Sequence, residues 1–109
     1  MKLSKSLKTS KVVKLEVKDG KKVIGRVYLY IIKNNLHKQP YGYVEDLFVE
    51  EEYRSRGLGR QLILGIIAEA KKQKLYKLVG TSRTFRTNIH SFYEKMGFKK
   101  WGFEFRMDL

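Results

Sequence analysis

Three arginines and two glycines lie within seven residues, in the stretch Arg54-Ser55-Arg56-Gly57-Leu58-Gly59-Arg60. An apolar run at 44–49 comes before this stretch and apolar residues at helical spacing come after it, which predicts a turn from a strand into a helix. Glycines let a backbone turn tightly and approach a ligand, and a helix N-terminus directs unpaired N–H groups at an anion. The pattern therefore predicts a pyrophosphate site, to which the arginines add positive charge.

A basic, solvated connection between a strand and a helix is the alternative, and two isolated glycines do not decide between the two. Other phosphate motifs do not match. The chain has no Gly-Lys-Ser/Thr of the P-loop kind, and residues 57–62 lack the third glycine of a dinucleotide fingerprint. We therefore do not expect ATP or NAD as ligands.

A second block, Phe92-Tyr93-Glu94-Lys95-Met96-Gly97-Phe98, begins about 33 residues after the loop. Together the two blocks resemble motifs A and B of the GNAT N-acetyltransferases, because Arg54-x-x-Gly57-x-Gly59 fits Gln/Arg-x-x-Gly-x-Gly/Ala and the second block is a tyrosine-bearing helix ended by Gly-Phe. The resemblance covers roughly residues 42 to 108. It implies an α/β acyl-CoA N-acyltransferase fold, a central mixed sheet with flanking helices, and acetyl-CoA as co-substrate.

The resemblance also implies which residues hold acetyl-CoA. Two parallel strands, at 43–49 and 75–81, would splay apart and admit the pantetheine arm, which would pair with the backbone around Leu47, Phe48 and Val49. The pyrophosphate would bind the N–H groups of the loop and helix start, at Arg54, Ser55, Arg56, Gly57, Leu58, Gly59 and Arg60. Family members usually carry an asparagine seven residues before the tyrosine. Here Arg86 occupies that place and Asn88 follows two residues later, so either could make the contact.

Acetyl transfer to an amine needs a group that accepts the amine proton and an acid that protonates the departing thiolate. Glu45 is the candidate base, because its strand neighbours are apolar and a carboxylate there needs a reason. Pairing with a nearby Arg or Lys is the alternative for Glu45 or Asp46, and strand alternation places Asp46 on the opposite face. By resemblance Tyr93 is the acid, with core packing as its alternative. For His90 we expect helix packing or capping, and no metal site is indicated.

Periodicity and turn residues predict one domain over residues 1–109, with residues 1–10 as a flexible basic arm. Asp19-Gly20 should join a hairpin of strands at 11–18 and 23–32. A strand at 41–49, a helix that begins near Leu58 and carries Lys71, Lys72 and Lys74 at its C-terminal end, a short strand at 75–81 and a helix at 88–96 should follow. Residues 98–107 read as closing strand material.

The front of the chain departs from the family. GNAT domains commonly begin with a strand and two helices that form one wall of the acceptor pocket, whereas the residues before 41 read as strands. The site could be open to a bulky substrate, a second subunit of a homodimer could supply the wall, or the chain could be a catalytically weak acyl-CoA-binding protein. Acidic residues at 45, 46 and 50–52 would attract cationic acceptors such as a lysine side chain, a protein N-terminus or a polyamine.

Composition leaves one rival open. The chain carries 24 Lys and Arg against 11 Asp and Glu, a formal net charge of +13. Aromatic residues at 28, 30, 41, 43 and 85 could stack on bases, so a nucleic-acid-binding module is a second hypothesis.

Cysteine is absent, which excludes a thiol nucleophile and favours direct transfer in a ternary complex. Because no apolar run is long enough to cross a membrane and the start lacks a signal-peptide core, we expect a cytoplasmic protein.

Overall fold

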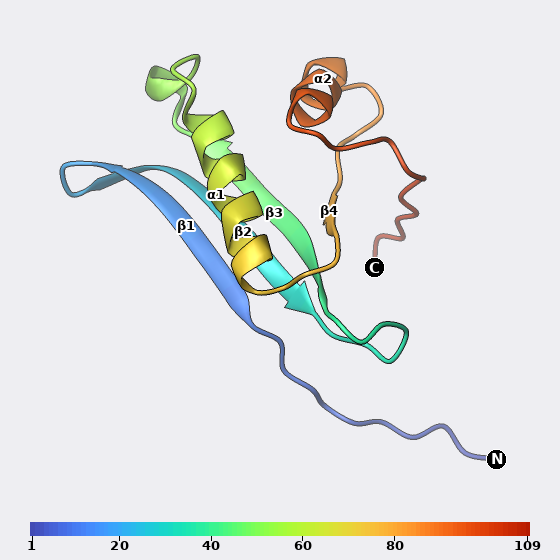
Figure 1. The fold of residues 1–109 in the computed structure, drawn as a ribbon. Helices are drawn as coiled ribbons and strands as arrows, with labels where there is room; N and C mark the ends of the chain where they lie inside the picture. The colour runs from blue at the N-terminus through green and yellow to red at the C-terminus, as the bar shows by residue number, and fades with distance from the viewer.

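The computed structural model describes residues 1–109, and its first element of secondary structure is a long β-hairpin (Figure 1). Strands β1 (Val12–Asp19) and β2 (Lys22–Ile32) pair antiparallel and are joined by a tight turn in which Gly20 has a φ of +60°. Glycine takes this left-handed conformation without steric cost. The predicted hairpin is confirmed, and Figure 1 shows the exposed arm that precedes it running away from the sheet.

The sheet has four strands in the order β1-β2-β3-β4. Strand β3 (Tyr41–Val49) is antiparallel to β2, and β4 (Leu78–Gly80) is parallel to β3. Helix α1 (Leu58–Lys72) makes the crossover between this parallel pair, as such a connection requires. The predicted mixed sheet is confirmed, but β4 is much shorter than the strand expected at 75–81.

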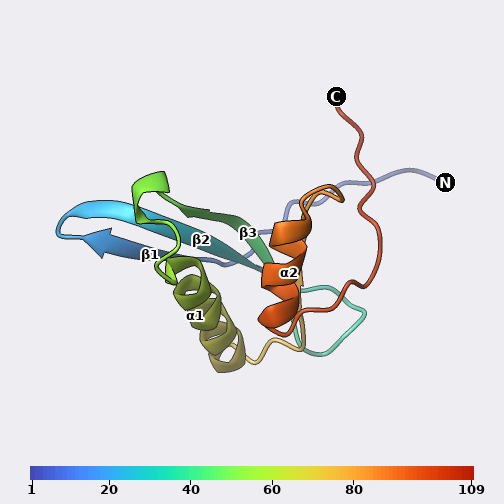
Figure 2. The same cartoon turned by 90° about the horizontal axis from the view of Figure 1, so that it is seen from above.

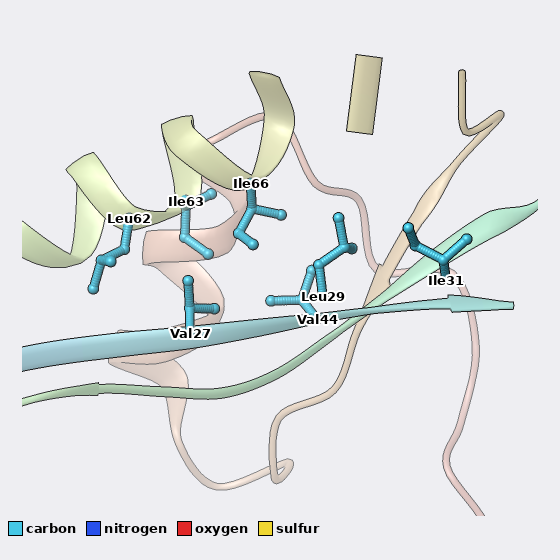
Figure 3. Close-up of a cluster of buried hydrophobic side chains, with 7 residues drawn as sticks. All are labelled: Val27, Leu29, Ile31, Val44, Leu62, Ile63 and Ile66. Carbon is cyan, nitrogen blue, oxygen red and sulfur yellow. The ribbon is translucent and has the colours of Figure 1, made fainter. Parts of the chain in front are cut away.

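The hydrophobic core lies between α1 and one face of the sheet (Figure 2). Apolar residues recur along α1 at helical spacing, so one stripe of the helix faces the strands. Figure 3 shows side chains of α1 pointing toward those of β2 and β3. The buried cluster consists of Val27, Leu29, Ile31, Val44, Leu62, Ile63 and Ile66. Neither helix covers the other face of the sheet (Figure 2), which we call the outer face and which carries Arg26, Tyr28, Tyr30, Tyr43 and Glu45.

A β-bulge in β3 reverses the alternation of its side chains. Glu45 lies opposite Tyr28 and Phe48 opposite Arg26, so two residues of β3 face one residue of β2. Val44 is buried in the core before the bulge, whereas Leu47 packs against the core after it. Asp46, inside the bulge, has a φ of +54° and bonds Arg26 on the outer face. The expectation that Asp46 faces away from Glu45 is therefore wrong, because strict alternation fails at the bulge.

The chain ends with helix α2 (Thr87–Lys95) and an extended tail. The helix agrees with the predicted 88–96 within one residue at each end, and Gly97 follows it with a φ of +103°. The predicted strand at 98–107 is wrong. Residues 98–109 pair with no strand, and Trp101, Phe103 and Phe105 are fully or almost fully exposed. Alternating aromatics favour a strand, but a strand also needs a ladder partner, and β4 bonds only β3.

We expect Gly42→Ala to destabilise the fold by about 1–3 kcal/mol, since over-packing a tight core forces neighbours to move. A Cβ at this position would lie 2.6–2.9 Å from side-chain atoms of Leu29, Leu75 and Leu78. Urea unfolding of the variant measures the loss. Gly102→Ala is the matched control, because a Cβ there meets nothing within 4 Å. Equal midpoints for the two variants would contradict the packing described.

Candidate active site

The turn into α1 leaves a set of backbone donors without partners. After a short 3-10 turn, η1 (Glu51–Tyr53), Ser55 has a φ of +64° and Gly57 a φ of +79°. No backbone N–H of residues 55–60 donates to another backbone group, and no side chain caps the helix. Unpaired N–H groups at a helix N-terminus form a site for an anion. The local geometry thus fits the predicted pyrophosphate site, whose individual contacts stay predictions.

The three arginines of the turn do not behave alike. Arg54 turns back to β3, where its Nε donates to the carbonyl oxygen of Val49 at 2.8 Å and its guanidinium lies 5.4 Å from the ring centre of Phe48. Arg56 lies over the ring of Tyr53 at 5.2 Å. Arg60 is exposed and forms no ion pair. Of the three, Arg60 is the one that the structure does not engage in holding the loop.

Tyr53 ties this turn to the hairpin. Its hydroxyl donates to Asp19 Oδ2 at 2.6 Å, and that hydrogen bond raises the pKa of Tyr53 above its usual value of 10.0. The acidic residues of η1 therefore lie near the end of the hairpin. Asp46 is paired with Arg26 at 2.7 Å instead. The acidic stretch at 45–52 is thus divided between two places and does not form the single acidic patch that its sequence suggested.

Strands β3 and β4 separate beside the bulge (Figure 1). Only residues 42–44 of β3 pair with β4, so residues 45–49 have no strand neighbour on that side. The N–H of Glu50 donates to Ile24 of β2 at 2.8 Å, and alternate residues of a strand direct their backbone groups to opposite edges. The backbone groups of Val49 and Leu47 therefore face the opening. This free edge, which runs toward the turn at 55–60, suits an extended arm that carries amides.

Tyr93 of α2 lies where the two strands separate. Its ring packs against Gly80 of β4, where a Cβ added to the glycine would lie 3.7 Å from the tyrosine Cε1, and against Phe98, with ring centres 5.2 Å apart. Burial raises the pKa of Tyr93 above 10.0, and the nearby carboxylate of Glu45 and the hydroxyl of Tyr43 raise it further. The fold thus brings Glu45 near enough for its charge to act on the Tyr93 hydroxyl, although the two residues are far apart in sequence.

Glu45 is exposed on the outer face, so the burial among apolar strand neighbours on which its choice as candidate base rested is wrong. No helix covers this face, and water reaches the carboxylate. Glu45 lines an open depression of about 450 Å³ together with Ser10, Tyr30, Ile32 and Tyr43. Sequence reasoning missed Tyr43 as a site residue, although its position two residues before Glu45 places it on the same face. The Tyr43 hydroxyl lies 3.2 Å from Thr81 Oγ1.

The start of α2 carries Arg86 and Asn88, the two residues for which a contact with acetyl-CoA was predicted. Arg86 is the N-cap residue, and its carbonyl accepts the N–H groups of Ile89 and His90. Arg86 and Asn88 are both exposed, and their proposed contacts with acetyl-CoA stay predictions. The ring of His90 is half-buried, with its Nε2 2.8 Å from the carbonyl oxygen of Arg83. This bond fits the structural role expected for His90.

Comparison with known proteins supplies the family. A model of the acetyltransferase (GNAT) family matches residues 6–98. The chain is 35% identical over 69 residues to an L-ornithine N5-acetyltransferase of Arabidopsis thaliana, an alignment that covers 61% of this chain and 30% of that protein. It is 34% identical over 68 residues to a glucosamine 6-phosphate N-acetyltransferase of Trypanosoma brucei brucei, which covers 62% and 44%. The chain spans less than half the length of these curated relatives.

Solved structures agree in fold. An acetyltransferase of Trypanosoma brucei superposes with a TM-score of 0.80 at 28% identity, over 90% of this chain and 69% of that chain. The glucosamine-6-phosphate N-acetyltransferase of Arabidopsis thaliana gives 0.81 at 20% identity, over 89% and 66%. No helix of the structure has the length and apolar character needed to span a membrane. Because the family model matches most of its residues, the chain belongs to the GNAT family of acetyltransferases.

Proposed function

We propose that this chain binds acetyl-CoA in the opening between β3 and β4 and transfers its acetyl group to a primary amine. The observation that carries the proposal is one continuous path: unpaired N–H groups at 55–60 lead along the free edge of β3 to the point where β3 and β4 part, beside Glu45 and beside Gly80, on which the ring of Tyr93 packs. The relatives named above act on ornithine and on glucosamine 6-phosphate, both of which carry a primary amine. A primary amine is therefore the acceptor class, without a choice among its members.

Each part of the path has a task. The N–H groups at the start of α1 hold the pyrophosphate, and the backbone of Leu47 and Val49 pairs with the amides of the pantetheine arm. The Arg54 side chain, bonded to Val49, has to share or release that carbonyl when the arm binds. Acetyl-CoA supplies a thioester whose carbonyl carbon bonds the amine nitrogen as the carbon–sulfur bond breaks.

Two side chains manage the protons. A protonated amine cannot attack, so Glu45 accepts its proton, directly or through water in the open depression. Tyr93 donates its hydroxyl proton to the departing sulfur, and the second proton that the nitrogen loses as it becomes an amide nitrogen returns to the tyrosine oxygen through water. Its raised pKa keeps it protonated at neutral pH, as this role demands. No cysteine is present to form an acetyl-enzyme, and the ternary complex transfers the group directly.

One observation favours a second function, binding of acyl-CoA with little or no turnover. The outer face beside Glu45 is open, and Tyr30, at 38% exposure, has no helix above it. An acceptor held on one side only would be poorly oriented, and orientation contributes much of an enzyme's rate. The variants below separate the two functions, because only an enzyme loses turnover while it keeps its cofactor.

Calorimetric titration should show micromolar binding of acetyl-CoA and of desulfo-CoA, and Gly57→Ala should weaken it about tenfold, because a side chain strains the left-handed turn by ~1–2 kcal/mol and moves its N–H groups. Gly20→Ala is the matched control, since Gly20 also has a positive φ and open space around it but lies in the hairpin turn. If the two variants bind alike, the turn does not hold the pyrophosphate.

A short RNA titrated beside the variants tests the hypothesis of a nucleic-acid-binding module. Salt-sensitive RNA binding without acetyl-CoA binding would favour that hypothesis.

Glu45→Gln should lower kcat by about 10²- to 10⁴-fold, the usual contribution of a general base, because glutamine cannot accept the amine proton. The dissociation constant of acetyl-CoA should stay within about twofold of the wild-type value. Glu16→Gln, an exposed carboxylate of β1 paired with Lys14, controls for loss of charge. Unaltered turnover in Glu45→Gln removes Glu45 from the mechanism.

Tyr93→Phe should lower kcat by about 10²-fold at neutral pH while KM for acetyl-CoA changes little, because the ring remains and only the proton donor is lost. The decline of the wild-type kcat at alkaline pH should be centred above pH 10.0, because burial raises the pKa of Tyr93 above that value and the hydroxyl is the active form. Steady-state rates measured from neutral pH upward provide the check. A wild-type decline centred below pH 10 that disappears in Tyr93→Phe contradicts the assignment.

A further inference from the structure

One ion pair spans the bulge of β3. Arg26 of β2 donates twice to Asp46, from Nε to Oδ2 at 2.7 Å and from Nη2 to Oδ1 at 3.2 Å. The same guanidinium lies 4.7 Å from the ring centre of Phe48. Arg26 therefore contacts both Asp46, which lies inside the bulge, and Phe48, where regular pairing with β2 resumes. A two-bond contact of this kind fixes direction as well as distance.

The bulge determines which way the next residues face. If the same sequence paired with β2 without a bulge, its side chains would alternate between the two faces without interruption. Leu47 would then lie on the outer face and Phe48 in the core. The backbone groups that face the opening beside β4 would then be those of Phe48 and not those of Leu47 and Val49. Asp46 has to adopt a φ of +54° for the bulge to exist. This conformation is uncommon for any residue except glycine, though aspartate tolerates it better than most.

We propose that Arg26 and Asp46 are positioning residues for acetyl-CoA: their ion pair holds the bulge that directs the backbone of Leu47 and Val49 into the opening between β3 and β4. This inference rests on the proposed function. Neither side chain is assigned a contact with acetyl-CoA or with the reacting atoms. The hydrogen bonds from Arg26 lower the pKa of Asp46 below its usual value, so its carboxylate is charged, and the pair intact, across the neutral range.

The test is Arg26→Ala, which leaves Asp46 without its partner. We expect the dissociation constant of acetyl-CoA to rise about fivefold, the equivalent of ~1 kcal/mol, as part of the population loses the bulge. Lys14→Ala is the matched control. It removes one positive charge from a neighbouring pair on the same face, Lys14–Glu16 at 3.0 Å with comparable exposure, and does not touch the bulge. Its binding should stay within about twofold of wild type.

A rescue variant separates positioning from direct attraction of the cofactor. Glycine adopts a positive φ freely, so Arg26→Ala/Asp46→Gly should hold the bulge without the ion pair and return the affinity close to the wild-type value. Amide spectra of Leu47 and Val49 by nuclear magnetic resonance should shift in Arg26→Ala and revert in the double variant. Arg26→Ala/Asp46→Ala removes the same two charges, but alanine disfavours a positive φ, so a merely electrostatic role of Arg26 would let both double variants recover the affinity and a positioning role only the glycine variant.

The outcomes divide cleanly. Wild-type affinity and unchanged spectra in Arg26→Ala overturn the inference, and so does weakened binding that glycine at 46 fails to restore. If wild-type protein does not bind acetyl-CoA at all, the proposed function fails. The spectra of the same variants then still decide whether the ion pair holds the bulge, and the positioning role for acetyl-CoA is withdrawn with the function.

Discussion

The unpaired edge of β3 is the feature around which the bulge, the glycine turn and the core are arranged. Backbone N–H and C=O groups need partners, and a strand inside a sheet normally finds them on both sides. Here β4 leaves β3 after residue 44. The edge beyond that point is satisfied by water, by the Arg54 side chain at Val49, or by a ligand. The backbone groups along such an opening are free to pair with an extended molecule, and this pairing makes little demand on side-chain identity.

Two neighbouring features depend on that edge. The bulge sets which backbone groups face the opening, and the crossover helix α1 begins at the end of the same strand, where residues 55–60 present their free donors. The core holds both in place, because Leu47 and Val49 pack against it after the bulge while the backbone beside them stays open. The side chains of these residues therefore pack against the core, while their backbone groups have no strand partner on the side of β4.

The charged side chains lie in two regions, one at the start of α1 and one on the outer face. The chain has a large positive excess, and α1 begins among arginines, two of which are engaged with aromatic rings and with the strand end. On the outer face, by contrast, Asp46 and Glu16 are matched by Arg26 and Lys14. Exposed pairs add little to stability as a rule, and a two-bond arginine–carboxylate pair such as Arg26–Asp46 is the exception to that rule. Glu45 has no such partner and is the carboxylate that remains available beside Tyr93.

Local signals in the sequence determined the hairpin, the helix with its apolar stripe, the glycine turn and α2, because each depends on neighbours a few residues apart. Hence the order of elements and the strand-to-helix turn were predictable, whereas the roles of Glu45, Tyr93 and the turn in binding and catalysis stay predictions. Tertiary structure alone decided the face of Asp46, the role of Arg54 and the unpaired tail at 98–109. A bulge, a side chain that turns back and a strand without a partner each depend on residues distant in sequence, and alternation or spacing along one segment carries no record of them.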